Sequence, residues 1–134
     1  MPDIFISYSR KDSTQALTLA ERLRAEGLDV WIDRQGITGA EQWASEIVEG
    51  INACSTFAIL LSEYSIASEN VLRELTLASE KRKRLLPIAL ERVKLPSSFE
   101  YPLAGLQRVT ISDFDAILRL PQAEDEELFA VLSK

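Results

Sequence analysis

The stretch Thr56-Phe57-Ala58-Ile59-Leu60-Leu61 is apolar at every position after its threonine. A short run without polar alternation is typical of a β-strand covered on both faces, as in a parallel sheet. In the segment that follows, Val71, Leu75 and Ala78 lie four and three residues apart, the spacing of one helical face. A buried strand followed by an amphipathic helix favours an α/β fold.

The same alternation of strand and helix patterns runs along the rest of the chain. Four further strands are predicted at Asp3–Tyr8, Leu28–Ile32, Leu85–Leu90 and Arg108–Ile111. Further helices are predicted from Asp12 to Gly27, from Trp43 to Ile51 and from Glu124 to Leu132. Parallel strands joined by helices need right-handed crossovers. We therefore expect a flavodoxin-like, five-stranded parallel sheet with helices on both faces and the first strand placed centrally.

Local signals set finer expectations. Asp12, with Gln15 three residues later, has the signature of a capping box at a helix start. Pro87 removes one hydrogen-bond donor from its strand and should lie at a strand end or a bulge. The segment 93–105 contains two prolines and is predicted to be a loop, and residues 112–134 match no motif.

Length and composition indicate one globular domain over residues 1–134, which is compatible with a complete small protein or with one domain of a longer one. The net charge of -6 argues against a nucleic-acid partner, which usually needs a basic face. No signal peptide and no apolar stretch of membrane-spanning length is present, so we expect no membrane partner and a cytoplasmic location.

Cys54 is the single cysteine, and the chain contains no histidine. An internal disulfide and a metal site built on cysteine or histidine are therefore excluded. Nucleophilic catalysis by Ser-His-Asp or Cys-His groups is excluded for the same reason. We expect no bound metal.

Glu74 is the most informative residue for function. It stands one position off the apolar stripe of its helix, shortly after a buried strand. In an open parallel sheet, strand ends and the starts of the following helices line the ligand crevice, where a carboxylate can do chemistry. The alternative is a solvated helix residue. Because Glu74 stands beside the stripe, we expect its substitution to change stability by no more than about ±0.5 kcal/mol.

Three α/β families are excluded by their missing residues. No Gly-x-Gly-x-x-Gly follows the first strand, and no glycine-rich loop ends in Gly-Lys-Ser or Gly-Lys-Thr. A response-regulator receiver needs an acidic pair after its first strand and an aspartate at the end of its third. This chain has Ser7-Tyr8-Ser9-Arg10 and Leu61-Ser62 at those places.

Five motifs follow one another between about residues 3 and 111. They are Asp3–Asp12, Leu28–Asp33, the loop Asp33–Gly39, Phe57–Ser62, and the pair Ser68–Leu75 with Leu86–Ile88. In this order they resemble the Toll/interleukin-1 receptor (TIR) domain family, in particular its bacterial branch. The loop resembles the family's BB loop, and its two glycines predict mobility and packing against a neighbouring copy.

The resemblance implies that the chain is an NAD+ glycohydrolase acting in signalling or defence, with a linear or cyclised ADP-ribose product. NAD+ is then a substrate, and no cofactor is expected. Glu74, followed by Leu75, matches the catalytic glutamate of the family. Nicotinamide leaves as a neutral molecule, so the reaction needs no general acid. A carboxylate near the ribose stabilises the positive charge that develops on the sugar.

The resemblance also implies which residues contact the substrate: Ser9, Arg10, Asp33, Ile37, Gly39, Trp43, Ser62 and Asn70. Arg10 would meet the pyrophosphate, or be a solvated loop arginine. Trp43 would pack its helix onto the sheet or touch the ligand, and Ser62 would bind the ligand or begin the next loop. Asn70 departs from active relatives, which often carry tryptophan there. We expect Glu74 to share one cleft with Ser9, Arg10 and Asp33.

Two other classes of function stay open. Animal receptors and adaptors of this family signal by assembling, so the alternative is a non-catalytic TIR–TIR interaction module. A nucleotide-binding sensor without turnover is the third class. In active relatives assembly moves the BB loop and completes the site. We therefore expect other TIR domains as partners, in a homotypic oligomer or filament.

Overall fold

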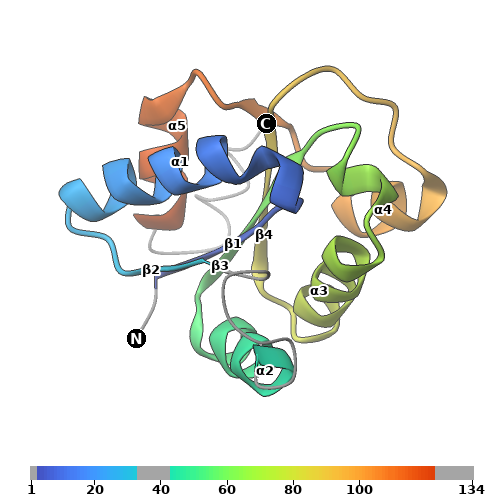
Figure 1. Ribbon diagram of the computed structural model, residues 1–134, viewed down its shortest axis with the longest axis horizontal. Coiled ribbons are helices and arrows are strands. Elements are labelled where there is room, and N and C mark those ends of the chain that lie inside the picture. The colour runs from blue at the N-terminus through green and yellow to red at the C-terminus, as the bar shows by residue number, and fades with distance from the viewer. Residues whose placement is uncertain (1–2, 33–42, 123–134) are drawn as a thin grey trace.

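A five-stranded parallel sheet organises the computed structural model, which describes residues 3–32 and 43–122 (Figure 1). The strands run in the order β2-β1-β3-β4-β5, and every pair is parallel. They are β1 (Ile4–Ser7), β2 (Val30–Ile32), β3 (Thr56–Leu61), β4 (Arg84–Ala89) and β5 (Val109–Thr110). The flavodoxin-like order is as predicted: β1 lies inside the sheet between β2 and β3, although β3 holds the middle place.

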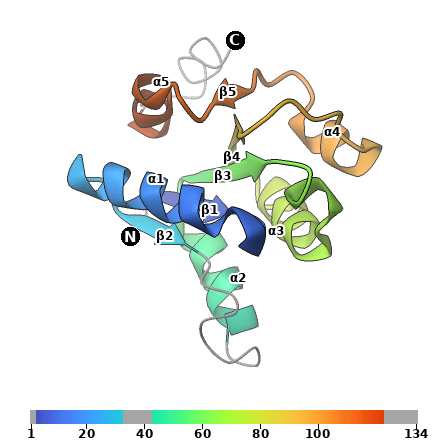
Figure 2. The ribbon, with the colours of Figure 1, turned by 45° about the horizontal axis from the view of Figure 1, so that its top comes forward.

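Helices cover both faces of the sheet. They are α1 (Ser13–Ala25), α2 (Trp43–Ala53), α3 (Glu69–Glu80), α4 (Ser97–Leu103) and α5 (Phe114–Arg119). Helices α1 and α5 pack on one face, and α2, α3 and α4 pack on the other (Figures 1 and 2). The helix expected at Glu124–Leu132 and the loop at Asp33–Gly39 lie outside the described residues.

Two apolar clusters, one on each face, hold these layers together. Along β1, Ile4 and Ile6 join the cluster under α1, whereas Phe5 joins the cluster under α2 and α3. Successive side chains of a strand point to opposite faces, so a strand covered on both sides is apolar at most of its positions. All six residues of β3 are buried, which explains its apolar sequence from Phe57 to Leu61.

Helix α1 ends as its sequence predicts. The N–H of Gly27 donates to Arg24 O at 2.9 Å, and the N–H of Leu28 donates to Leu23 O at 3.1 Å. This pair of bonds is a Schellman motif, which needs a left-handed residue after the helix. Gly27 supplies it with a φ of 92°.

The prediction for Pro87 is wrong, because this proline lies inside β4. The N–H of Leu90 donates to Leu61 O of β3 at 2.9 Å, so even-numbered residues of β4 face β3 and odd-numbered residues face β5. Among the described residues of β4, strand β5 pairs only with Ile88 and Ala89. Within the described part of the chain, the side of Pro87 that lacks a donor therefore meets no paired strand, and no ladder bond is lost there.

Helix α4 occupies a segment that was predicted to be a loop. Pro96 is its N-cap and Pro102 lies in its last turn, so neither proline prevents a short helix. Leu95, Phe99 and Leu103 are spaced four apart and are all buried against the α3 side of the sheet. That spacing was the signal for a helix, and the prolines obscured it.

Candidate active site at the carboxyl edge of the sheet

Glu74 lies on the buried face of α3, with only 5% of its surface exposed. It shares this face with Val71, Leu75 and Ala78, because α3 packs against α2 as well as the sheet. The structure therefore corrects the expectation that Glu74 stands beside the apolar stripe and that its substitution changes stability little. A buried carboxylate depends on the groups that surround it.

Ser7, the last residue of β1, is a hydrogen-bond partner of this carboxylate. Its hydroxyl donates to Glu74 Oε1 at 2.7 Å, and Ser7 itself is 0% exposed. Hydroxyl–carboxylate bonds of about this length are charge-assisted and stronger than neutral ones. Ser7 is not among the site residues expected from the sequence. The available signal was its position two residues after Phe5, which puts a polar side chain on the buried face of a strand.

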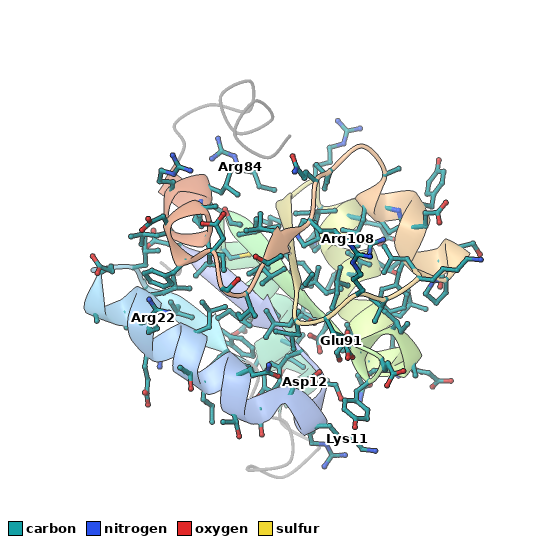
Figure 3. The ribbon with its side chains drawn as sticks, turned by 90° about the horizontal axis from the view of Figure 1, so that it is seen from above. Lys11, Asp12, Arg22, Arg84, Glu91 and Arg108 are labelled. Carbon is teal, nitrogen blue, oxygen red and sulfur yellow. The ribbon has the colours of Figure 1, made fainter. Side chains whose placement is uncertain are left out.

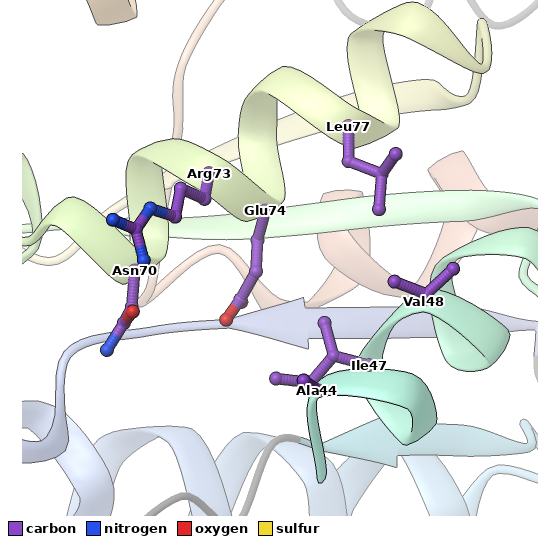
Figure 4. Close-up of a pocket in the computed structure, with 7 residues that line it drawn as sticks. All are labelled: Ala44, Ile47, Val48, Asn70, Arg73, Glu74 and Leu77. Atoms are coloured by element: carbon purple, nitrogen blue, oxygen red, sulfur yellow. The ribbon is translucent and has the colours of Figure 1, made fainter. Parts of the chain in front are cut away.

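A cavity of about 280 Å³ lies between α2 and α3, with Glu74 in its wall (Figure 4). Helix α2 supplies an apolar side and α3 a more polar one; the lining residues are Ala44, Ile47, Val48, Asn70, Arg73, Glu74 and Leu77. Figure 4 shows the Glu74 side chain reaching from α3 toward β1, with the α2 side chains opposite. The volume is near the lower end of the range of about 300–1,000 Å³ for small-molecule sites.

A second cavity, of about 480 Å³, adjoins the first at Asn70, which lines both. Its other walls are the turn after β1, with Tyr8, Ser9, Arg10 and Lys11, and the start of α3 at Ser68. Two cationic side chains therefore stand beside the cavity that holds Glu74. Arg10 and Lys11 are exposed, and Ser9 accepts from the N–H of Lys11 at 3.4 Å.

The structure brings four of the sequence-predicted site residues together at this edge: Ser9, Arg10, Asn70 and Glu74. Asp33, Ile37 and Gly39 lie outside the described residues. Trp43 begins α2, and its side chain is likewise outside the described part of the structure.

Ser62 is placed differently from these four. It follows β3, is 2% exposed and lines neither cavity. Its hydroxyl donates to Asp12 Oδ2 at 2.5 Å. The predicted capping box at Asp12 is therefore wrong: the Asp12 side chain makes no cap bond, because its carboxylate turns to Ser62 instead.

A second contact supports the same turn. Figure 3 shows Lys11 and Asp12 at the beginning of α1, and Lys11 Nζ lies 4.8 Å from the centre of the Tyr64 ring. A cation over an aromatic face is attracted to the ring. Together with the Asp12–Ser62 bond, this contact joins the turn after β1 to the segment after β3, so two contacts hold the cationic wall against that segment.

Within residues 3–32 and 43–122, no cluster of three or more His, Cys, Asp or Glu side chains could hold a metal ion. None of the helices in those ranges has the length and apolarity needed to span a membrane.

A family model described as "TIR domain" matches residues 4–121 of the chain. No curated protein sequence matches it. Among solved structures, the TIR domain of the Toll-related receptor TRR-2 from Hydra magnipapillata superposes with a TM-score of 0.70 at 17% identity, covering 100% of both chains.

Two other solved structures share the fold. A metazoan TIR-STING receptor from C. gigas, in complex with 2',3'-cGAMP, has a TM-score of 0.72 at 22% identity; the match covers 100% of this chain and 40% of the receptor. The Clostridium botulinum CMP N-glycosidase has a TM-score of 0.60 at 13% identity, covering 90% of this chain and 98% of the enzyme. At such identities the similarity shows the fold alone.

Proposed function

We propose, from the premise that this chain belongs to the TIR domain family, that it is an NAD+ nucleosidase with Glu74 as its catalytic residue. One observation carries the proposal. The Glu74 carboxylate is 5% exposed, accepts a hydrogen bond from Ser7, and lies in a cavity that adjoins a second one with two cations. The fold also occurs in a CMP N-glycosidase, an enzyme named for cleaving an N-glycosidic bond.

The proposed reaction breaks the bond between C1′ of the ribose and the nicotinamide nitrogen. The electron pair leaves with nicotinamide, which becomes neutral, and positive charge develops on the ribose ring. A nearby carboxylate stabilises this charge, and it does so more strongly where water is excluded. Water then attacks C1′ and loses a proton to give ADP-ribose, or a hydroxyl of the same molecule attacks to give a cyclic product.

The two cavities suit the two ends of such a substrate. The nicotinamide ribose would lie beside Glu74, with the ring against the apolar wall of Ile47 and Val48. The pyrophosphate would extend toward Arg10 and Lys11, because guanidinium and ammonium groups bind phosphate oxygens. Asn70, which lines both cavities, would lie between the ribose and the pyrophosphate.

The remaining site assignments follow from the family resemblance. We propose that Ser9, Asp33, Ile37, Gly39 and Trp43 border the same substrate. Ser62 is assigned to holding Asp12, since its one hydroxyl proton is already donated there. Association with further TIR domains, as an oligomer or filament, is proposed to complete the site. The rate of cleavage should then rise more than linearly with protein concentration.

The test measures nicotinamide release from NAD+ by chromatography over a range of protein concentrations. Glu74→Gln keeps the shape of the side chain and removes its charge, so it should abolish turnover. Glu69→Gln is the matched control, because Glu69 lies on the same helix and its side chain is 88% exposed, paired with Arg73 at 3.9 Å. It should match the unmodified protein.

Two results would contradict the proposal. One is full activity of folded Glu74→Gln, and the other is no nicotinamide release by the unmodified protein at any concentration. The second result would leave the two classes without turnover, the TIR–TIR interaction module and the nucleotide-binding sensor.

A further inference from the structure

We infer that Ser7 is a positioning residue for the reaction, whose hydroxyl orients the Glu74 carboxylate relative to the bound substrate. This inference rests on the proposed function of Glu74. It begins from the 2.7 Å bond between Ser7 Oγ and Glu74 Oε1, which joins residues 67 positions apart in the chain. No local sequence pattern requires such a bond.

Ser7 is anchored in the interior of the sheet. It ends β1, which lies between β2 and β3, and its backbone pairs with Ile59 of β3. Glu74 belongs to a helix and carries a long side chain with several rotatable bonds. The hydroxyl therefore ties the carboxylate to a strand of the sheet, and the sheet becomes the reference for its position.

The same strand also positions the cationic cavity. The residues directly after Ser7, from Tyr8 to Lys11, form one wall of that cavity. A substrate held by this turn and a carboxylate held by Ser7 thus share one backbone segment. Their relative placement depends on Ser7, and catalytic groups need placement within about 0.5 Å.

Ser7 acts through Glu74 and does not touch the substrate itself. Its surface is 0% exposed, and it lines neither of the two cavities. Its one hydroxyl proton is donated to the carboxylate. A hydrogen bond of this kind holds the carboxylate in one orientation.

Ser7→Ala tests the inference, because it removes the hydroxyl and leaves a side chain that fits the same space. We expect kcat for nicotinamide release to fall by about 10- to 100-fold, since a misplacement of 1 Å can have an effect of that size. KM should change by less than about twofold, because the lost interaction matters in the transition state and not in binding.

Thr56→Val is the matched control. Thr56 is also 0% exposed, and its hydroxyl has no hydrogen-bond partner within the described ranges. It is the first residue of β3, at the amino-terminal end of the strands, whereas Glu74 lies near their carboxyl-terminal ends. This variant should keep the kcat and KM of the unmodified protein, and thermal unfolding should show that both variants are folded.

The outcomes separate the inference from the proposed function. If Ser7→Ala keeps kcat within about twofold, or raises KM in place of lowering kcat, Ser7 does not position the carboxylate. If kcat falls equally in Thr56→Val, the effect of Ser7→Ala is due to a general disturbance of packing, which also overturns the inference. In each of these cases an inactive Glu74→Gln leaves the proposed function standing. No release by the unmodified protein would remove both.

Discussion

Ser62 Oγ donates a hydrogen bond of 2.5 Å to Asp12 Oδ2, across 50 positions of sequence. Asp12 is 6% exposed and Ser62 is 2% exposed, so water cannot easily replace either partner. The bond holds the turn after β1 against the segment after β3. It therefore supports the wall that carries Ser9 and Arg10 at the candidate site.

Replacing Ser62 with alanine should lower the free energy of unfolding by about 1–3 kcal/mol, because the buried Asp12 carboxylate loses a donor. Urea denaturation measures the change. Thr18→Ala is the control: it removes an exposed hydroxyl that donates to Thr14 O at 2.8 Å, and should stay within about ±0.5 kcal/mol. Equal effects in the two variants would contradict a special role for the Asp12 bond.

Gly50 packs directly under Trp31. A Cβ at this position would lie 3.0 Å from two carbons of the indole ring and 3.2 Å from the ring of Phe5. These two rings are stacked with centroids 4.5 Å apart, so neither can move without disturbing the other. Gly50→Ala should therefore destabilise the protein by about 1–3 kcal/mol through overpacking.

The matched control for Gly50 is Glu49→Ala, on the exposed side of the same helix. It should change the free energy of unfolding by no more than about 0.5 kcal/mol. A gain of stability in Gly50→Ala, as expected from helix propensity alone, would show that the indole ring shifts easily.

Burial raises the pKa of the Cys54 thiol from 9.0 to about 11, against a smaller lowering effect of Lys83. The folded protein therefore holds this proton more tightly than the unfolded chain. Its contribution to stability should be complete below pH 9.0 and should decline as the pH rises toward 11. The Cys54→Ala variant has no thiol to titrate. Its free energy of unfolding should therefore decline less over this pH range than that of the unmodified protein.

The thiol chemistry gives a second measurement. Because the thiolate is the reactive form, Cys54 of the folded protein should react slowly with a disulfide reagent at pH 8 and rapidly after denaturation. Fast reaction of the folded protein would show that the thiol is more accessible than its 2% exposure implies.

Arg10 tests the proposed direction of the substrate. If its guanidinium meets the pyrophosphate, Arg10→Ala should raise KM for NAD+ by about tenfold and leave kcat nearly unchanged, the pattern of lost uniform binding. Lys94→Ala, which removes an exposed cation of the loop before α4, should change neither constant. A loss of kcat without a change in KM would place Arg10 at the reacting bond instead.

The five-stranded sheet could be predicted because its signals are local. The bounds of β3 agree with the predicted strand from Thr56 to Leu61, since a strand covered on both faces favours an apolar run such as Phe57 to Leu61. The end of α1 was equally clear, because a left-handed residue after a helix favours glycine, here Gly27. The failures at Pro87 and α4 arose where a proline suggested a break that the surrounding packing does not require.

By itself, therefore, the sequence determined the order of the five strands and of α1, α2 and α3, the family resemblance and the choice of Glu74. Only the tertiary structure decided how deeply Glu74 is buried, that Ser7 donates a hydrogen bond to it, and that the Asp12 side chain bonds to Ser62 and makes no cap bond to α1. The physical reason is that apolar periodicity and backbone conformation are written in neighbouring residues. A hydroxyl and a carboxylate carry no mark of their partner, and they find it only when the sheet brings distant segments together.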